Sequence, residues 1–587
     1  MTIASSNRRT TLRACALLVA IVAAPAACTL DLAGKPPGGA DGSASASSST
    51  SSAPSTSTST STGGGGGAGA TTSASGSAGT GGAPTFCEPN AVVSCYDGPP
   101  KTENIGACKD GTHTCLPDGS AFGACANQIK PAAEDCLEPA DEDCDGKANA
   151  CLGTTLGGAA IGKAATDEVL FAVAADLAGN LFIGGVGGAT PPDGGIFAVT
   201  SGSGGIGKVL PNGTLSWAVS MSTVVAKGYS VVRGLATDSL GNVLVIGELQ
   251  GTTSGGAINV PGLGGIDVFV AKLDTTGKTL WAKSFGNAAD QYGYSVAVDG
   301  MDNVLITGRT VGAVDFGGGA PGVSAGVGDN VFVAKLDSLG NHLWSKVFGD
   351  DSVQIGNSVA ATPDGDVVVA GELAGAMDFG GGKVVTSAGG KDIFVARLAG
   401  ATGAAIWANR YGDDNDQVAN GVVVGPDGGV VLTGSMVGKV NFGGIDHDAN
   451  GKANVFVAKL HSDGTYDWSH DYGDDADNQV GLAISVDPAK NIVVVGYFKG
   501  TISFGATTLT DVSNSKSTNV FVAKLSAAGG PVWAYRFGDT NDATLWAVAT
   551  DAKSNVLLGG TFDGVLDLPP MITALSSYDG FWARLAP

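Results

Sequence analysis

The segment Val268-Phe-Val-Ala-Lys-Leu273 decides the fold, because near-copies of it recur along most of the chain. Copies occupy residues 331–336, 393–398, 455–460 and 520–525, and a degraded copy occupies residues 206–210. A tryptophan follows each copy, at Trp217, Trp281, Trp344, Trp407, Trp468 and Trp533, with intervals from 61 residues (407 to 468) to 65 residues (468 to 533). Self-similarity at a nearly fixed period is the signature of a repeat architecture.

Two further short runs recur between the tryptophans, and each occurs seven times. The first is rich in small residues, as in 295–299, and the second follows a tight turn with Gly or Asn, as in 303–308. Both runs are β-branched and bounded by turn residues, which is typical of strands. Each unit therefore carries four strands, for instance 295–299, 303–308, 331–336 and 343–348.

Four-stranded sheets repeated radially are β-propeller blades, so we expect an all-β, seven-bladed propeller over residues 153–587. The small-residue strand suits the crowded centre of the ring, and the tryptophan strand suits the rim. Residues 157–162 align with 532–538, and residues 580–585 copy the third strand of a unit. We therefore expect the N-terminal segment to supply the outer strand of the seventh blade, which removes both exposed edges. The alternative, a solenoid, would need capping repeats.

This pattern resembles the bacterial β-propeller repeat family of secreted and surface proteins. The resemblance rests on Asp-Val-Phe-Val-Ala-Lys-Leu at 267–273, Gly-Asn-Val at 241–243 and Asp-Phe-Gly-Gly at 315–318. It implies extracellular scaffolding or binding and brings no shared catalytic residues. The turns before the tryptophans also resemble the sialidase Asp-box and the quinoprotein tryptophan-docking motif, which are structural in their own families.

The bulk composition limits the partners and the number of folded units. A chain of 587 residues is too long for one ordinary domain. Its 94 glycines follow no Gly-X-Y period, which excludes collagen. The net charge of −23 argues against a nucleic-acid partner, because phosphate binding needs clustered Lys and Arg.

The N-terminus reads as a secretion signal over residues 1–27. Arg8, Arg9 and Arg13 precede an apolar run at 14–24, which is too short to span a membrane. The ending Pro25-Ala-Ala-Cys28 resembles a bacterial lipobox with proline in the usual leucine position, which implies lipidation of Cys28. Ordinary cleavage without lipidation is the alternative. We expect an outer-membrane or cell-surface lipoprotein, otherwise a periplasmic or extracellular protein, that touches a membrane only through this anchor.

Residues 28–84 are the lipid-anchor region followed by a Ser/Thr/Gly/Ala linker, which we expect to be a disordered tether because it has little apolar surface to bury. Residues 85–152 then form a cysteine-rich module. Its eight cysteines are Cys87, Cys95, Cys108, Cys115, Cys125, Cys136, Cys144 and Cys151. An even number behind a secretion signal indicates disulfides, whereas zinc, the alternative, usually shows CxxC pairs. Eight cysteines allow 105 pairings, so the connectivity stays open.

An acidic loop within this module has the opening of a calcium-binding loop. Asp141, Asp143 and Asp145 alternate, and glycine follows at Gly146, but Leu152 stands where a bidentate glutamate is usual. The segment resembles cysteine-rich metal-binding modules of bacterial secreted proteins, on Glu-Asp-Cys at 134–136 and Asp-Cys-Asp-Gly at 143–146. A weak calcium site and a merely solvated acidic loop are the two interpretations.

A second acidic pattern follows each tryptophan strand. The candidate cation- or ligand-binding residues are Asp350, Asp351, Asp413, Asp414, Asp416, Asp474, Asp475 and Asp477. In a propeller these loops share one face, where converging carboxylates attract calcium or a basic ligand. The alternative is that Gly-Asp-Asp makes a soluble turn which the repeat copies.

The sequence predicts a surface-anchored binding or adhesion scaffold whose propeller presents a face to a protein or glycan ligand. It offers no Gly-x-Ser-x-Gly or His-Glu-x-x-His motif and no paired histidine spacing, so we predict no enzymatic activity and no cofactor other than calcium. An extracellular enzyme acting on glycans or on a quinone-dependent substrate is one alternative. A purely structural spacer is the other.

Overall fold

The computed structural model describes residues 86–99, 101–131, 144, 153–162, 167–187, 202–223, 228–319, 328–474, 477–512, 517–569 and 571–587. The predicted signal peptide, Cys28 and the tether lie outside these residues. So do Asp141, Asp143, Asp145 and Asp475. No helix in the described part of the chain is long and apolar enough to cross a membrane.

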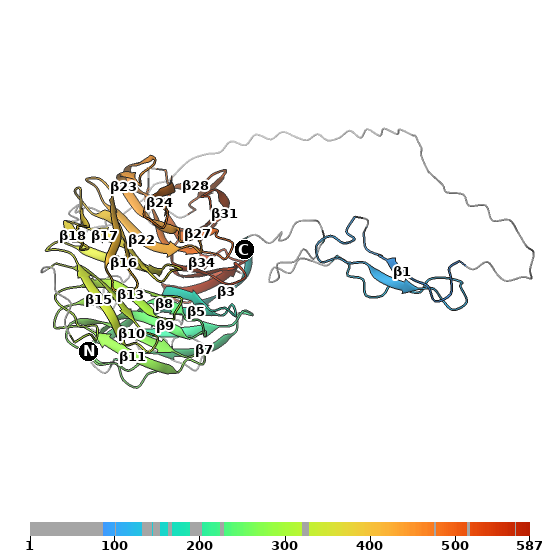
Figure 1. The fold of residues 1–587 in the computed structure, drawn as a ribbon, viewed down its shortest axis with the longest axis horizontal. Helices are drawn as coiled ribbons and strands as arrows, with labels where there is room; N and C mark the ends of the chain where they lie inside the picture. Colours follow the sequence, from blue (N-terminus) through green and yellow to red (C-terminus); the bar gives the residue numbers. More distant parts are fainter. Residues whose placement is uncertain are drawn as a thin grey trace, which may run out of the picture. The chain divides into compact units, whose positions relative to one another are not determined.

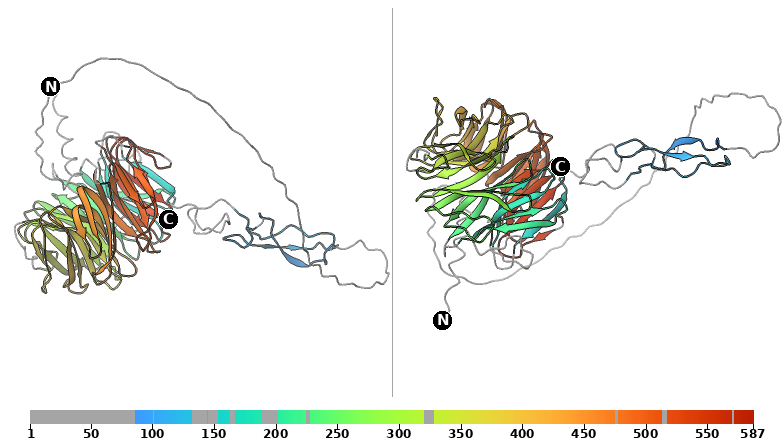
Figure 2. Two further views of the ribbon diagram at one scale, coloured as in Figure 1. Left: turned by 90° about the horizontal axis from the view of Figure 1, so that it is seen from above. Right: turned by 60° about the horizontal axis from the view of Figure 1, so that its bottom comes forward.

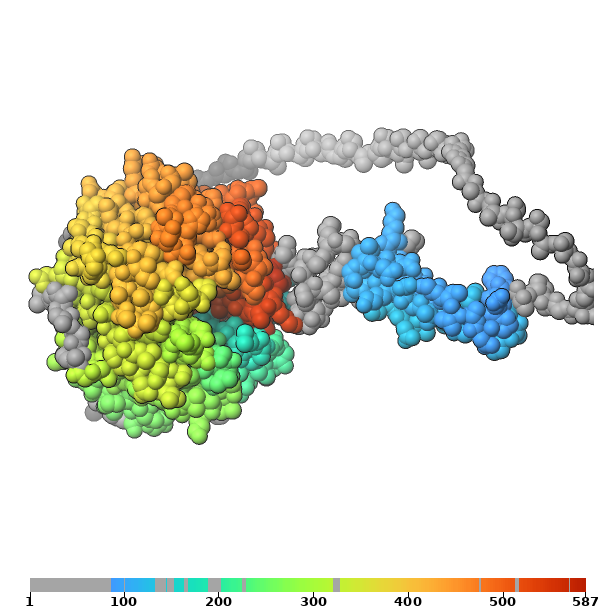
Figure 3. Space-filling model, viewed as in Figure 1, coloured from blue at the N-terminus to red at the C-terminus, as the bar shows by residue number. Residues whose placement is uncertain are grey.

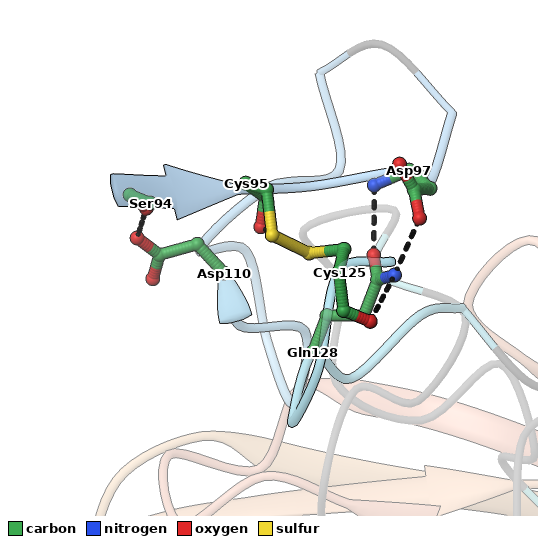
Figure 4. Close-up of a disulfide and its surroundings, with 6 residues drawn as sticks. All are labelled: Ser94, Cys95, Asp97, Asp110, Cys125 and Gln128. Carbon is green, nitrogen blue, oxygen red and sulfur yellow. Dashed lines mark hydrogen bonds between the residues drawn. A yellow bond between two sulfur atoms is a disulfide. The ribbon is translucent and has the colours of Figure 1, made fainter. Parts of the chain in front are cut away.

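The cysteine-rich region contains a short antiparallel ribbon of β1 (Val92–Cys95) and β2 (Gly111–Thr114). Disulfides join Cys87 to Cys115, Cys95 to Cys125, and Cys108 to Cys144. Figure 4 shows the second of these, beside the hydrogen bonds between Asp97 and Gln128 and between Ser94 and Asp110. The prediction of disulfides is confirmed for these six cysteines, while Cys136 and Cys151 lie outside the described residues.

The rest of the described chain forms seven four-stranded antiparallel sheets, named here blades 1 to 7 (Figure 1). Blade 1 consists of β4 (Val169–Ala175), β5 (Leu181–Gly187), β6 (Ser203–Val209) and β7 (Leu215–Ser220). Blade 2 consists of β8 (Tyr229–Thr237), β9 (Val243–Gln250), β10 (Ile266–Leu273) and β11 (Thr279–Phe285). Blade 3 consists of β12 (Gln291–Val298), β13 (Val304–Thr310), β14 (Asn330–Leu336) and β15 (His342–Phe348).

The remaining blades follow the same order. Blade 4 consists of β16 (Gln354–Ala361), β17 (Val367–Leu373), β20 (Asp392–Leu398) and β21 (Ala405–Tyr411). Blade 5 consists of β22 (Gln417–Val424), β23 (Val430–Asn441), β24 (Asp446–Leu460) and β25 (Tyr466–Tyr472). Blade 6 consists of β26 (Gln479–Val486), β27 (Ile492–Phe498), β30 (Asn519–Leu525) and β31 (Pro531–Phe537). Blade 7 consists of β32 (Ala543–Thr550), β33 (Val556–Phe562), β36 (Asp579–Leu585) and β3 (Thr155–Ile161).

The first strand of each blade lies at the centre of the ring. β4 contacts β8, and contacts between successive first strands continue through β12, β16, β22, β26 and β32 back to β4. Their residues are mostly small, as predicted, and the tryptophan strands lie outermost. The third strand is covered on both faces by neighbouring blades, and every residue of β14 is buried. This double covering explains why the recurring segment is apolar almost throughout.

The ring is closed by strands from opposite ends of the described propeller. β3 pairs antiparallel with β36, with Ala159 opposite Trp582 and Ile161 opposite Gly580. Figures 1 and 2 show these teal and red strands side by side, and Figure 3 shows the teal and red residues bordering each other on the surface. The predicted borrowing of an N-terminal outer strand by the seventh blade is confirmed.

The inner strands begin earlier than the small-residue pattern predicted. β12 begins at Gln291 instead of Ser295, because a β-bulge at Tyr294 interrupts its register with β13. A bulge occurs at the same place in every inner strand, and it shifts the side-chain alternation by one residue. Three connections between second and third strands also carry small hairpins: β18 (Ala376–Asp378) with β19 (Val384–Thr386), β28 (Thr501–Phe504) with β29 (Thr507–Thr510), and β34 (Val565–Leu566) with β35 (Ile572–Thr573).

Candidate functional site

The turns between inner and second strands share one end of the propeller, named here the turn face. The antiparallel order puts the turns between third and outer strands at the same end and the other connections at the opposite end, the loop face. In blade 2, Asp238 accepts hydrogen bonds from the backbone of Leu240 and Asn242 at 3.0 and 2.8 Å. Its other oxygen lies 2.8 Å from Asn242 Nδ2 and 2.7 Å from Lys272 Nζ. One carboxylate thus fixes the whole turn.

This clasp between a turn aspartate and a third-strand lysine repeats around the ring. The pairs are Asp176–Lys208 at 3.4 Å, Asp238–Lys272 at 2.7 Å, Asp299–Lys335 at 2.8 Å and Asp487–Lys524 at 3.0 Å. In blade 4 the first turn residue is Thr362, and Asp364 and Asp366 bind Arg397 instead. In blade 5 the first turn residue is Gly425, and the carboxylate that binds Lys459 belongs to Asp427 instead. The buried cation therefore keeps a partner in each of these blades.

The tryptophans lock adjacent blades together. Trp344 Nε1 donates to the carbonyl of Gly400, in the third-to-outer turn of blade 4, at 2.9 Å. The equivalent bonds run from Trp217 to Thr275, Trp281 to Ser338, Trp407 to Ser462 and Trp468 to Ala527. Trp533 has no such bond among the described residues, because the outer strand of blade 7 comes from the N-terminal side and no turn joins it to β36. The tryptophans are therefore structural, as the sequence indicated.

The turn tips differ from blade to blade, although the clasp beneath them is repeated. Each tip presents an exposed apolar side chain: Leu177, Leu240, Met301, Pro363, Pro426, Pro488 and Ala552. Leu177, Leu240 and Met301 are 78%, 75% and 72% exposed, although they are apolar. These seven residues are named here the apolar rim. Searching for recurring residues missed them, whereas comparing the second and third residues of the seven turns for apolar residues of varying type would have found them.

A cavity of about 470 Å³ opens at the centre of the turn face. The last residues of several inner strands line it, among them Ala175, Val298, Ala361, Val424 and Val486. Pro363, Pro426 and Pro488 of the apolar rim also line it. Asp176 and Asp487 reach its wall with their carboxylates engaged by lysines. Asp551 also lines the cavity and accepts from Asn555 Nδ2 at 2.8 Å. The cavity wall is therefore mainly apolar, and its carboxylates are engaged in ion pairs or hydrogen bonds.

The predicted acidic loops lie on the loop face, but their leading carboxylates are engaged by backbone groups. Asp350 accepts from the amides of Ala376 and Ser352, both at 2.7 Å, and from Gln354 Nε2 at 2.6 Å. Asp413 accepts from the amide of Lys439, and Asp474 from that of Thr501. Burial would raise the pKa of Asp350 and Asp413, but these hydrogen bonds outweigh it and hold both pKa values below the ordinary range.

The remaining acidic residues of these loops have different surroundings. Asp351, Asp414 and Asp477 are exposed, and Asp416 accepts from the amide of Lys391 at 2.9 Å. Within the described ranges, no group of three or more His, Cys, Asp or Glu side chains could hold a metal ion. The leading carboxylates shape turns, as the alternative interpretation of the sequence had it. A cation held by the loops stays a prediction.

A serine, a histidine and an aspartate form a relay in blade 5. His447 Nδ1 lies 2.8 Å from Asp471 Oδ1, and its Nε2 lies 2.7 Å from Ser469 Oγ. Ser469 and His447 are only 1% and 4% exposed, so a substrate has no access to the hydroxyl. The order of contacts matches that of a hydrolase triad. Because Ser469 and His447 are buried, the role of the relay is structural: it connects the extended start of β24 to the adjacent strand β25.

No family model matches the chain. An uncharacterized WD repeat-containing protein of Acanthamoeba polyphaga mimivirus is 23% identical over 395 residues, which are 55% of this chain and 28% of that protein. The chain thus spans less than a third of this relative. The resemblance to bacterial secreted proteins stays a prediction.

Three solved structures illustrate the fold likeness. A catalytically inactive virginiamycin B lyase from Staphylococcus aureus has a TM-score of 0.34 at 8% identity, covering 73% of this chain and 99% of that one. Sqt1 from Chaetomium thermophilum has a TM-score of 0.34 at 9% identity, covering 75% and 100%. A gluconolactonase from Xanthomonas campestris has a TM-score of 0.28 at 11% identity, covering 63% and 90%. The propeller fold itself fits a binding scaffold.

Proposed function

We propose that the protein is an extracytoplasmic, surface-anchored binding scaffold that holds an apolar segment of a protein partner at its turn face. The observation that carries the proposal is the apolar rim around the central cavity. Seven turns have related frameworks, and each tip carries an exposed apolar residue that differs from blade to blade, next to polar residues. Large exposed apolar groups gathered on one face of a soluble protein mark interaction sites.

The geometry favours a protruding apolar side chain over a sugar. The cavity of about 470 Å³ lies within the size range of ligand pockets, and apolar side chains and prolines dominate its wall. None of the seven rim residues is aromatic, so the rim lacks the flat surface on which a sugar ring would stack. Burying Leu177, Leu240 and Met301 would stabilise a complex by about 1.5–3 kcal/mol for each fully covered side chain.

The disulfides of the cysteine-rich region support the proposal that the protein functions outside the cytoplasm. Three disulfides within residues 87–144 are expected in an oxidising compartment, because cytosolic thiols are kept reduced. Attachment to a surface rests on the sequence pattern at Cys28. Labelling cells with radioactive palmitate, with Cys28→Ser as control, tests the anchor independently of binding.

A photo-crosslinking experiment tests the binding face. A benzophenone side chain placed at Leu240 or Met301, in cells that naturally produce the protein, should capture one discrete partner. The matched control is the same group at Val384, which is 57% exposed but lies in β19 on the loop face. With the captured partner in purified form, Leu240→Asp should weaken binding at least tenfold, which corresponds to about 1.4 kcal/mol.

Three outcomes would contradict the proposal. Capture only from Val384 would move the binding site to the loop face. Turnover of a substrate from a hydrolase panel, without stoichiometric binding, would favour the enzyme alternative. No capture from any position would favour a structural spacer.

A further inference from the structure

Three successive blade junctions on the loop face share one arrangement of buried oxygen atoms, and the next junction, between blades 5 and 6, places Asn454 and Gln479 around Gly473 in the same way. The third strand of one blade has Asp or Asn as its first or second residue, and the inner strand of the next blade begins with Gln. The pairs are Asp267 with Gln291, Asn330 with Gln354, and Asp392 with Gln417. All six residues are at most 1% exposed.

One oxygen in each pair has no hydrogen-bond donor among the described residues. These atoms are Asp267 Oδ1, Asn330 Oδ1 and Asp392 Oδ1. Each faces the amide oxygen of its glutamine across a glycine that follows the outer strand. A Cβ added to Gly286, Gly349 or Gly412 would lie less than 3.0 Å from both oxygens of its junction. The glycine therefore lets two acceptor oxygens come close to its backbone, and each such pair of facing oxygens is named here a cradle. The glutamine oxygens accept from the amides of Asn287, Asp350 and Asp413. Two facing acceptors repel each other unless something positive or hydrogen-donating lies between them.

Each cradle also has a carboxylate in it or directly beside it. The first junction combines Asp267 with Asn287, and the second exchanges the two residue types as Asn330 and Asp350. The third has two carboxylates, Asp392 and Asp413, and Arg410 lies 3.1 Å from Asp392 Oδ2. A carboxylate in or beside each cradle favours a positive charge there.

The junction between blades 6 and 7 provides an internal comparison. Its glutamine is replaced by Ala543, and Asn519 begins the third strand. Here Arg536 Nη1 donates to Asn519 Oδ1 at 3.2 Å and to the carbonyl of Gly538 at 2.6 Å. Asn519 Oδ1 also accepts from the amide of Val512 at 3.0 Å. The atom that faces Gly538 at this junction is Asn519 Nδ2, which donates to the carbonyl of Asp539 at 2.9 Å. A hydrogen-bond donor therefore lies here where each of the three cradles has an oxygen without a donor.

We propose that each of the three cradles binds a hard cation, sodium or calcium, through its paired side-chain oxygens. Carboxylate and amide oxygens are the ligands that these ions prefer. The cation would be bound by the buried oxygens of the cradles and not by Asp351 and Asp414, which are exposed in the adjacent loops. Cation binding is independent of partner binding at the turn face, because the two sites lie at opposite ends of the blades.

Thermal unfolding of the full chain tests the proposal. Chelator-treated protein is compared in sodium chloride, calcium chloride and tetramethylammonium chloride at equal ionic strength. We expect sodium or calcium to raise Tm by about 2 °C or more over tetramethylammonium, because an ion that binds only the folded state stabilises it. For calcium, equilibrium dialysis with the radioactive ion counts the bound ions. For sodium, ²³Na relaxation reports binding.

Two variants in the cradles and two in the exposed loops make the test specific. Asp392→Asn should remove one ion per chain and reduce the Tm shift, and Asn330→Asp should increase the affinity at least several-fold. The second variant keeps the test valid should the first fail to fold. Asp351→Asn and Asp414→Asn, in the same loops but exposed, should change neither the count nor the shift.

The following results would overturn the proposal. Equal Tm values in all three salts, with no bound ion, would mean that water fills the cradles. A shift that survives Asp392→Asn and ignores Asn330→Asp, but disappears in the exposed-loop variants, would place the ion on the surface aspartates.

Discussion

At the scale of single residues, a glycine and a tryptophan form a shared contact at the five junctions from blade 1 to blade 6. Gly403 has φ +68°, in the left-handed region, and a Cβ there would lie 2.7 Å from the ring of Trp344. The equivalent glycines 277, 340, 464 and 529 face Trp217, Trp281, Trp407 and Trp468 in the same way. The glycine is needed twice, for the turn conformation and for the close approach of the indole.

The two requirements can be separated with a matched pair of variants. Gly403→Ala should lower the free energy of unfolding by about 1–2 kcal/mol for its backbone conformation and by about 1–3 kcal/mol more for overpacking against Trp344. Gly365→Ala also has a positive φ, of +86°, but nothing lies within 4 Å of its Cβ position. Chemical denaturation measures both. Equal losses would show that the tryptophan contact contributes nothing.

The clasp between Lys335 and Asp299 should contribute strongly to stability because both side chains are buried. Lys335→Met would leave the carboxylate without its cation and should cost about 3–5 kcal/mol. Lys439→Met is the control. Lys439 pairs with Asp448 at 3.6 Å, but its side chain is 71% exposed. Loss of such a surface ion pair should cost at most about 1 kcal/mol. Denaturant unfolding at pH 7 tests the difference, and similar losses would contradict the buried clasp.

The same clasp gives the stability a defined pH dependence. Burial would raise the pKa of Asp299, but Lys335 and Asn303 outweigh it, so the pKa lies below its ordinary value of 3.8. The pKa of Asp238 is lowered in the same way by Lys272 and Asn242. A carboxyl group with a lowered folded pKa contributes stability that is present above its unfolded pKa and is lost as pH falls through its folded pKa. The wild type should therefore lose stability below about pH 4, and Lys335→Met should lose less over that range.

At the scale of whole elements, β3 completes a blade whose other strands lie more than 380 residues further along the chain, as the pairing of Thr155 with Leu585 shows. Without β3, the edge of β36 would be exposed and could pair with another chain. The last blade would also lose the strand that joins the two ends of the ring. A single strand, β3, therefore contributes to the stability of the whole ring.

Replacing residues 155–161 with a Gly/Ser linker of equal length tests this closure. The expected results are a lower Tm by differential scanning calorimetry and concentration-dependent association by light scattering. The control is the same type of linker in place of residues 380–383, which lie in the turn between β18 and β19 outside the four-stranded sheets and outside the buried core. An unchanged Tm in the β3 variant would mean that the ring is stable without its shared blade.

At the scale of the whole molecule, the two ends of the propeller have different chemistry. The turn face has an apolar rim and a cavity whose carboxylates are already paired. The loop face has exposed aspartates above cradles of buried oxygens. Because the blades separate the two ends, Leu240→Asp should impair partner capture and leave the cation-dependent Tm shift unchanged. The capture and cation experiments can therefore fail independently.

The sequence by itself determined the parts of the protein that depend on repetition. The recurring strand, the tryptophans and the borrowed outer strand predicted seven four-stranded blades, because a buried sheet leaves the same pattern of apolar and turn residues in each copy. The cysteine count predicted disulfides, because an oxidising compartment is the usual setting for such a cluster. The pairings, such as Cys87 with Cys115, required the structure.

Only the tertiary structure decided what the varied residues do. Leu240 and Met301 lie in different repeats, yet ring closure brings them to one rim around a cavity. Asp392 and Gln417 likewise belong to different blades and meet only across a junction. The bulge at Tyr294 also left no distinct local signal, so the start of the inner strand was predicted too late. A repeated sequence pattern reveals the contacts that every blade makes. A site formed by different residues from several blades depends on distances between blades, and only the closed ring sets those distances.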